Sequence, residues 1–217
     1  MAQSYIKRIL NAQVYDVARE TPLDAAPLLS ARLGNQAFLK REDLQPVFSF
    51  KCRGAYNKMV HLDEAARAGG VVAASAGNHA QGVALAASKL GIKATIVMPV
   101  TTPLIKVDAV KALGAKVVMH GDSFDEAAVR ARVLTESEGF TFIHPFDDPD
   151  VIAGQGTVAV ELVRQAQQPL DYVFVCCGGG GLLAGMAAYL RYVWPQTRII
   201  GVEPEDAACV QAALDKG

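Results

Sequence analysis

The sequence predicts an α/β protein built on a parallel sheet, and two observations lead to this class. Short apolar runs rich in β-branched residues begin at residues 71, 94, 116 and 140, each bounded by turn residues as a buried strand would be. Segments with helical periodicity separate these runs, so the strands recur about every 23 residues. The leucine-rich repeat has a similar period, but its L-x-x-L-x-L pattern is absent. Alternating strands and helices at this spacing are typical of parallel βαβ units.

Cap signals predict where the helices between these strands begin. Thr102 is expected to cap a helix that has Pro103 at its first position. Ser123 and Glu126 have the spacing of a capping box at the start of another helix. The segment 78–90 is apolar on nearly every side, so we expect a deeply buried helix there.

Composition and charge predict a globular protein and exclude several classes of partner. The chain has 217 residues, of which 51% are hydrophobic and 20% charged, and its formal net charge is −1. Mean hydropathy is +0.20, unlike that of disordered chains. No basic excess is present to bind nucleic acid or an anionic membrane surface. No apolar run is long enough to span a bilayer, and the first residues lack a signal-peptide core, so a cytoplasmic protein is expected.

Four consecutive glycines at residues 178–181 form the first candidate site. They follow an apolar strand expected at 171–177 and precede a helix expected at 182–194, with a further strand at 198–203. Glycines leave the backbone N–H groups unobstructed, and the positive end of the helix dipole attracts anions. The strand–loop–helix context therefore predicts a phosphate cradle, and the alternative is a flexible turn.

A nicotinamide-dependent oxidoreductase is an alternative interpretation of the same stretch. Gly179, Gly181 and Ala184 satisfy the pattern G-x-G-x-x-A, and Glu203 ends the next strand where a ribose-binding carboxylate is expected. That motif normally occupies the first βα turn of its domain, whereas several βα units precede it here. Four glycines also exceed what the motif needs, so both observations weigh against this interpretation.

Lys51 is a candidate nucleophile because of its neighbours. It follows Phe48 and Phe50 and precedes Cys52 in a segment with few charges. Burial among such residues would disfavour the ammonium form and lower the pKa of the amine, as a Schiff-base lysine requires. Most lysines are solvated surface residues, so spacing alone leaves this role open.

Residues 75–82 form a third candidate site, because they leave one strand and open the next helix. Ser75, Gly77 and Asn78 suit a tight turn whose N–H groups point outward, which is a natural site for a carboxylate. An ordinary helix cap by Ser75 or Asn78 is the alternative. His79 by itself is more typical of a structural histidine than of a catalytic base.

The remaining histidines and the cysteines predict no metal site. The cysteines form no C-x-x-C pair, and no histidine lies at ligand spacing from them. Buried, reduced thiols of a cytosolic protein are expected at Cys52, Cys176, Cys177 and Cys209. The histidines interpreted as structural or surface residues are His61, His120 and His144.

In combination, these segments resemble the fold-type II pyridoxal-phosphate enzymes, the tryptophan-synthase-β-like group. Within that group the chain most resembles the biosynthetic threonine dehydratases (threonine ammonia-lyases), and the resemblance covers essentially the whole chain. The residues that carry it lie at 40–46 (KREDLQP), 49–51 (SFK) with 53–55 (RGA), 75–82 (SAGNHAQG), 152–157 (IAGQGT) and 178–182 (GGGGL). The combination is far more specific than any one segment.

The resemblance implies a role for each candidate residue. Lys51 would hold pyridoxal 5'-phosphate through its amine and later act as the base at the substrate Cα, with Phe50 near the cofactor ring. Asn78 would bond the 3-oxygen of the pyridoxal ring. The cofactor phosphate would be bound by the backbone N–H groups of Gly178, Gly179, Gly180, Gly181 and Leu182. The substrate carboxylate would be surrounded by Ser75, Gly77, Asn78 and His79.

The resemblance also implies a reaction and an architecture. The reaction is conversion of L-threonine to 2-oxobutanoate and ammonia, the first step of isoleucine biosynthesis, and L-serine would give pyruvate in the same way. The fold has two three-layer α/β/α lobes with mainly parallel sheets. Residues 1–48 and 146–217 would form the larger, cofactor-binding lobe, and residues 49–145 the smaller lobe with the carboxylate loop. The full-length form is expected to be a homo-oligomer that acts on a small amino acid.

Two departures separate the chain from the serine racemases that share this resemblance. Racemases carry a second serine at the position of Ala76, where it acts as acid and base on the opposite face, and alanine cannot do this. They also place an aspartate for a divalent metal where this chain has Cys209, so no such metal site is expected. The segment 203–217 instead resembles the biosynthetic dehydratases.

The length favours the N-terminal part of a longer enzyme, since the chain stops soon after the strand expected at 198–203. The residue that partners the pyridine nitrogen, the rest of the larger lobe's sheet and a regulatory domain would lie beyond residue 217. A sheet ended early leaves an open edge and uncovered apolar surface. A fragment that binds the cofactor without turnover is therefore a further alternative.

Overall fold

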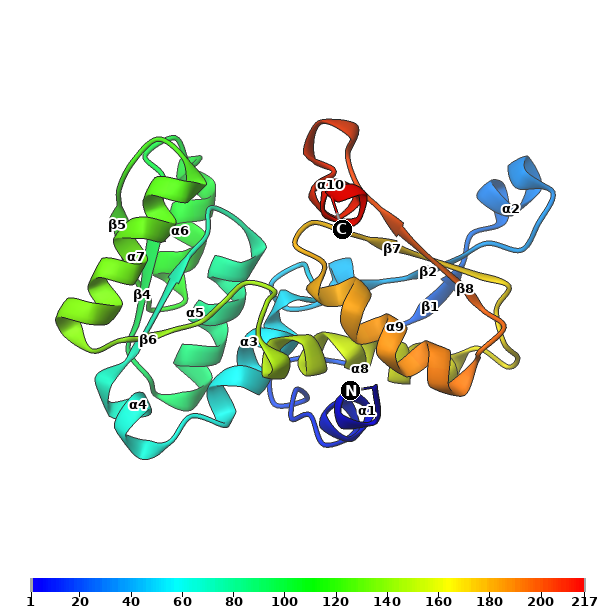
Figure 1. Cartoon of the computed structure of the whole chain (residues 1–217), viewed down its shortest axis with the longest axis horizontal. Helices are drawn as coiled ribbons and strands as arrows, with labels where there is room; N and C mark the ends of the chain where they lie inside the picture. The colour runs from blue at the N-terminus through cyan, green and yellow to red at the C-terminus, as the bar shows by residue number, and fades with distance from the viewer. Residues whose placement is uncertain (1, 217) are drawn as a thin grey trace.

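The computed structural model describes residues 2–216, and its largest sheet has four parallel strands (Figure 1). The strand order is β5-β4-β3-β6. The strands are β3 (Val71–Ala74), β4 (Ala94–Met98), β5 (Lys116–Met119) and β6 (Thr141–Phe142). They coincide with the four apolar runs of the sequence, so the prediction of an α/β fold with a parallel sheet is confirmed.

Helices cover both faces of this sheet and give it three layers. The helices on one face are α3 (Lys51–Val60), α5 (Asn78–Leu90) and α6 (Leu104–Ala112). The other face is covered by α7 (Phe124–Glu138). Along β3, Val71 and Ala73 are buried against the first set of helices, whereas Val72 and Ala74 are buried against α7. Successive side chains of a strand point to opposite faces, so β3 is buried on both sides as a central parallel strand should be.

A second core forms around two helices of the C-terminal half. α8 (Pro149–Gln165) and α9 (Gly181–Val193) pack against a parallel pair of strands, β7 (Tyr172–Cys176) and β8 (Arg198–Val202). Val173 and Val175 of β7 face this core. On the opposite face of the strand, Tyr172 is 45% exposed and Phe174 is 67% exposed. An apolar strand face therefore lies uncovered, as the sequence led us to expect.

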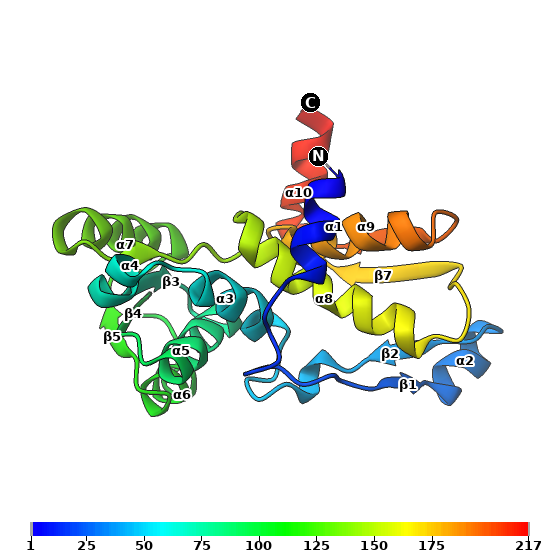
Figure 2. The same ribbon diagram turned by 90° about the horizontal axis from the view of Figure 1, so that it is seen from below.

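The N-terminal segment contributes a helix to this core and a projecting arm. α1 (Ala2–Leu10) packs on α8 and α9. The arm consists of the antiparallel strands β1 (Leu23–Ala25) and β2 (Phe38–Lys40) and of α2 (Pro27–Leu33), which joins them (Figure 2). The remaining short helices are α4 (Glu64–Gly69), η1 (Glu42–Leu44), η2 (Glu205–Ala207) and α10 (Cys209–Lys216). No helix in the described part of the chain is both long and apolar enough to span a bilayer.

Helix starts agree with the predicted caps at α7 but not at α6. Ser123 Oγ accepts from the N–H of Glu126, and the Glu126 carboxylate accepts from the N–H of Ser123, so the capping box is confirmed. The prediction that Thr102 caps α6 is wrong, because the helix begins only after Pro103 and has no side-chain cap. Pro103 keeps an extended backbone (ψ 137°), which places Thr102 one residue too early to reach the first-turn N–H groups.

Candidate functional site

Lys51 is the first residue of α3, and its amine is largely buried. The Nζ atom donates a hydrogen bond to the carbonyl oxygen of Pro145 at 2.7 Å and lies 5.5 Å from the centre of the Phe50 ring. Desolvation lowers the pKa of the Lys51 amine from 10.5 to about 8, and the nearby Cys176 raises it by a smaller amount. The lowered pKa that the sequence suggested for Lys51 is therefore present in the folded chain.

Two glycines allow neighbouring helices to approach the first turn of α3. A Cβ atom on Gly82 of α5 would lie 2.9 Å from the carbonyl oxygen of Lys51. A Cβ atom on Gly154 of α8 would lie 2.7 Å from the carbonyl oxygen of Arg53. Neither helix could keep its place with a larger residue at these positions, so the first turn of α3, which begins at Lys51, is fixed between α5 and α8.

The turn at residues 75–79 leaves the carboxyl end of β3 and enters α5 without a side-chain cap. Ser75 Oγ accepts a hydrogen bond from the N–H of Gly77 at 3.1 Å, which closes a local turn. Gly77 precedes the helix and no side chain caps it, so an ordinary cap by Ser75 or Asn78 is not what forms. In the described part of the chain, the N–H groups of Asn78 and His79 donate to no protein acceptor. They are available to an anion at the start of α5.

The ring of His79 is buried and neutral. Its Nε2 atom donates to the carbonyl oxygen of Ile143 at 2.9 Å, so that nitrogen carries the hydrogen. Burial above all, together with the charge of Lys51, lowers the pKa of His79 to about 3. Among the described residues, no group bonds its Nδ1 atom. The ring therefore anchors α5 to the segment after β6, and only the backbone of His79 faces the start of the helix as a donor.

The glycine loop joins β7 to α9, as the sequence predicts. Gly180 has a φ of +83°, a conformation that other residues rarely adopt. Within residues 2–216, the N–H groups of Gly178, Gly179, Gly181 and Leu182 donate to no protein acceptor. Gly181 and Leu182 belong to the first turn of α9, where helices leave N–H groups unsatisfied, and Gly178 and Gly179 precede it. Because these N–H groups lie at the positive end of α9, they can cradle an anion.

The segment 143–147, which follows β6, touches all three candidate sites. Carbonyl oxygens of this segment accept hydrogen bonds from the Lys51 amine and from the His79 ring. Phe146 lies against the glycine loop, since a Cβ on Gly181 would be 2.9 Å from the Phe146 carbonyl oxygen. A Cβ on Gly179 would overlap the Phe146 ring. The lysine, the turn at 75–79 and the glycine loop are thus brought together by one short stretch of chain.

Sequence reasoning missed Pro145 and Phe146, whereas its interpretation of His144 as a structural or surface residue agrees with the structure. His144 Nδ1 accepts hydrogen bonds from the N–H groups of Phe146 (3.3 Å) and Asp147 (2.7 Å), so the ring shapes the turn. Desolvation lowers the pKa of His144, which favours the neutral ring that can accept these bonds. A signal was available, because residues that follow parallel strands gather at the carboxyl edge of the sheet, where ligands bind.

Glu203 and the exposed cysteines differ from two interpretations of the sequence. The Glu203 carboxylate accepts from the N–H groups of Val210 (3.0 Å) and Gln211 (2.9 Å), so it caps α10 and is not free to bind a ribose. The prediction that all cysteines are buried is wrong for Cys176 and Cys209. Cys176 lies on the uncovered face of β7, and Cys209 begins α10 at the surface. Among the described residues, no cluster of three metal-ligating side chains was found.

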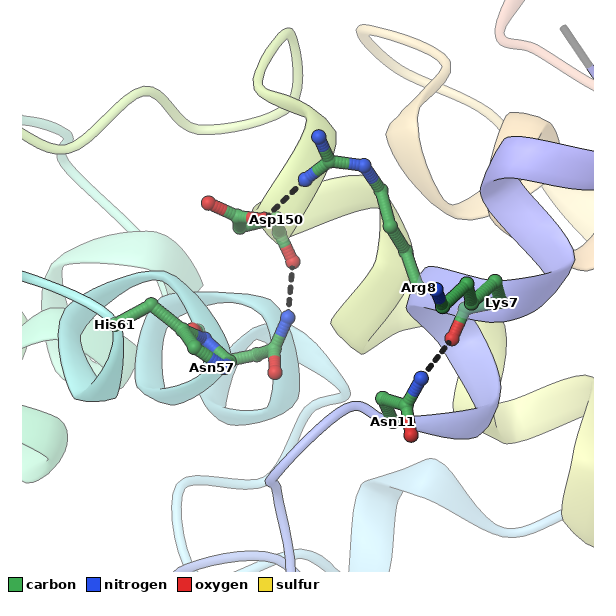
Figure 3. A pocket seen from close by; sticks show the side chains of 6 residues that line it. All are labelled: Lys7, Arg8, Asn11, Asn57, His61 and Asp150. Carbon is green, nitrogen blue, oxygen red and sulfur yellow. Dashed lines mark hydrogen bonds and ion pairs between the residues drawn. The ribbon is translucent and has the colours of Figure 1, made fainter.

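A surface pocket lies between α1, α3 and α8, apart from the residues above (Figure 3). Its lining residues are Lys7, Arg8, Asn11, Asn57, His61 and Asp150. An ion pair of 2.8 Å between Arg8 and Asp150 and a 2.7 Å hydrogen bond from Asn57 to the Asp150 carbonyl oxygen join its walls (Figure 3). His61 follows the last residue of α3, whereas Lys51 begins that helix, so this pocket is separate from the lysine site.

Comparisons with known proteins point to one family. Residues 14–217 match the model of a family described as pyridoxal-phosphate dependent enzyme. A biosynthetic, chloroplastic threonine dehydratase of Arabidopsis thaliana is 60% identical over 216 residues, which cover 100% of this chain and 36% of that relative. A biosynthetic L-threonine dehydratase of Burkholderia multivorans is 56% identical over 219 residues, covering 100% of this chain and 43% of that relative.

Solved structures give the same picture of the fold. The processed form of threonine deaminase isoform 2 from Solanum lycopersicum has a TM-score of 0.96 and 53% identity, covering 100% of this chain and 63% of that chain. A serine racemase of Dictyostelium discoideum has a TM-score of 0.86 and 32% identity, covering 100% of this chain and 68% of that chain. The chain therefore shares the fold of these enzymes, as the predicted fold class requires, and spans less than half of the two curated relatives above.

Proposed function

Because the chain belongs to the family of pyridoxal-phosphate dependent enzymes, we propose that it carries the reactive lysine, the phosphate cradle and the carboxylate turn of a threonine dehydratase. The reaction is the conversion of L-threonine to 2-oxobutanoate and ammonia, and L-serine would give pyruvate. The names of relatives at 60% and 56% identity support this substrate. The observation that carries the proposal is the buried amine of Lys51, held beside a loop of unpaired N–H groups by the segment 143–147.

The residues present fit the cofactor. The free N–H groups of the glycine loop and Leu182 would hold its phosphate at the positive end of α9. Lys51 would form the covalent link, Phe50 would pack near the ring and Asn78 would bond the 3-oxygen. When bound, the cofactor supplies an electron sink for the negative charge that develops at the substrate Cα.

Lys51 would first bind the cofactor and then accept the Cα proton. With a pKa of about 8, about a quarter of the amine is neutral at pH 7.5, against about a thousandth at the ordinary value. Only the neutral amine can act as a nucleophile or accept a proton. The hydrogen bond to the Pro145 carbonyl fixes the direction of the amine. Burial and this bond therefore prepare Lys51 for both roles.

The substrate carboxylate would bind at the start of α5, among Ser75, Gly77, Asn78 and His79. The N–H groups of Asn78 and His79 are unpaired there, and the helix dipole favours a negative charge. His79 would contribute through its backbone, because its ring is turned toward Ile143. Ala76 offers no acid or base on the opposite face of the substrate, which favours elimination over racemisation.

The proposal extends to the organisation of the protein. Residues 1–48 and 146–217 would form a larger lobe and residues 49–145 a smaller one, and the separate cores around the four-stranded sheet and around α8 and α9 support this division. A homo-oligomer in the cytoplasm, supplying isoleucine biosynthesis, completes the proposal. The four free thiols support a reducing compartment.

Product formation and cofactor binding together test this function. Purified protein with pyridoxal phosphate should form 2-oxobutanoate when threonine is added and should show the visible absorbance of lysine-bound cofactor. Lys51→Ala should abolish both signals, whereas Lys89→Ala, at an exposed position of α5, should change neither. Cofactor binding without product would favour the non-catalytic fragment. Tight NADH binding without pyridoxal-phosphate binding would contradict the proposal and favour an oxidoreductase.

A further inference from the structure

Three segments that carry the family resemblance, 40–46, 53–55 and 152–157, supply no side chain to the site described above, and they meet around Arg53. The side chain of Arg53 is completely buried. Its guanidinium donates to both carboxylate oxygens of Glu42, at 2.7 and 2.8 Å, and to both oxygens of Glu161, at 2.6 and 3.0 Å. Two carboxylates therefore close on one arginine, each with paired, directional hydrogen bonds.

A second layer of polar groups completes this arginine cluster. Lys40 Nζ donates to Glu161 Oε2 at 2.6 Å, and the Tyr15 hydroxyl donates to Glu161 Oε1 at 2.9 Å. The Thr157 hydroxyl accepts from Arg53 at 3.1 Å. Two cations and two carboxylates balance, so the cluster buries no net charge. Segments far apart in the sequence, from Tyr15 to Glu161, are joined at this one point.

The arginine cluster and the reactive amine lie on opposite sides of the same helical turn. Arg53 follows Lys51 by two residues, and a helix turns about 100° per residue, so their side chains leave α3 in nearly opposite directions. One side of the turn is anchored to Glu42 and Glu161, while the other presents the Lys51 amine to the Pro145 carbonyl. The position of the amine therefore depends on where Arg53 is held.

We propose that Arg53, held by Glu42 and Glu161, is a positioning residue that sets the place and direction of the Lys51 amine. Stability alone does not account for the cluster, because apolar packing of the same volume is often as stabilising as a buried ionic cluster. Paired Arg–carboxylate hydrogen bonds are directional, so the bonds to Glu42 and Glu161 define one position of this turn of the helix. The proposal rests on the proposed function in one respect, that the Lys51 amine is the reactive group.

Labelling of the cofactor-free protein reports the environment of this amine directly. Amine reagents modify only the neutral form, so the rate at Lys51 as a function of pH, followed by peptide mass spectrometry, gives its pKa. The titratable groups that influence the amine from neighbouring segments are Cys176, His79 and His144. All three are kept in every variant, so a change in the labelling profile reports the position of α3.

Two variants and a matched control separate positioning from stability. Arg53→Lys keeps the charge but loses the planar fork that binds two carboxylates. Thr157→Val removes one acceptor and keeps every charge. The control is Arg164→Lys, which alters an exposed ion pair between α8 and Glu20.

We expect wild-type Lys51 to label with a pKa of about 8 and the Arg53→Lys variant to label with a pKa higher by ~1 unit or more, as the amine gains water. In the cofactor-loaded protein, kcat should fall by ~10-fold or more with KM for threonine within ~3-fold. Thr157→Val should also raise the pKa at which Lys51 is labelled, by a smaller amount. If Arg53→Lys does not fold, the labelling profile of Thr157→Val tests the proposal in its place. Arg164→Lys should change neither the labelling profile of Lys51 nor kcat.

A lower Tm without a change in the Lys51 labelling profile would overturn the proposal, because a purely structural cluster would lower stability without moving the amine. The labelling requires neither cofactor nor turnover. Absence of threonine conversion in the wild-type protein would therefore contradict the proposed function while leaving this test intact.

Discussion

Replacing Gly82 with alanine measures how closely α5 holds the backbone of Lys51. The added Cβ would lie 2.9 Å from the Lys51 carbonyl oxygen, 3.0 Å from its carbonyl carbon and 3.2 Å from the backbone nitrogen of Cys52. All three are backbone atoms, so α5 and α3 must separate by about 0.5 Å to reach ordinary contact. Overpacking of this kind costs ~1–3 kcal/mol, and the better helix propensity of alanine offsets up to ~1 kcal/mol. We expect a net loss of ~1–2 kcal/mol in unfolding free energy, or ~2–8 °C in Tm.

The same displacement should reach the reaction. A shift of about half an ångström at Lys51 should lower kcat by ~10-fold with little change in KM. Thermal unfolding followed by circular dichroism and steady-state formation of 2-oxobutanoate measure the two effects. Ser88→Ala, at an exposed position of the same helix, should change neither. A Gly82→Ala variant with wild-type Tm and wild-type kcat would refute the close packing of α5 on Lys51.

Three further changes have defined outcomes. Phe146→Ala removes the ring that lies against the glycine loop. The dissociation constant for pyridoxal phosphate, measured by titration, should therefore rise by ~10-fold, whereas the control Phe142→Ala should change it by less than ~2-fold. Equal effects of the two substitutions would contradict this role of Phe146. The pKa of His79 is about 3 in the folded chain and ordinarily 6.5. Between these two pH values the unfolded chain binds more protons than the folded chain, so the unfolding free energy should fall as the pH drops from 6.5 to 3. Urea unfolding of the wild type and of His79→Gln should show a smaller pH dependence in the variant, and an equal dependence would count against a buried neutral ring. Ser123→Ala removes the capping box of α7 and should lower the unfolding free energy by ~1 kcal/mol in urea, so an unchanged midpoint would contradict the cap.

Local patterns predicted the features that depend on local physics. The four strands of the large sheet follow from short apolar runs between turn residues. The glycine loop follows from four residues without side chains between a strand and a helix. The failure at Thr102 is also local, since the extended backbone of Pro103 delays the start of α6 by one residue. Such patterns identify elements and their chemistry but not the distances between them.

The features that sequence reasoning missed depend on contacts between distant residues. Lys51 and Pro145 are 94 positions apart, and Arg53 and Glu161 are 108 positions apart. No periodicity links such residues, because only the folded arrangement of α3, α8 and β6 brings them together. Phe146 likewise gains its contact with the glycine loop from tertiary packing. The candidate residues could therefore be named from the sequence, but not the segment that assembles them.

Covalent capture of the cofactor tests the central claim, that Lys51 is the residue that holds it. Protein loaded with pyridoxal phosphate is reduced with borohydride, digested and examined by peptide mass spectrometry. We predict that a pyridoxyl group appears on Lys51 and on no other lysine. A pyridoxyl group on a different lysine, or none in protein that shows the absorbance of bound cofactor, would contradict the claim.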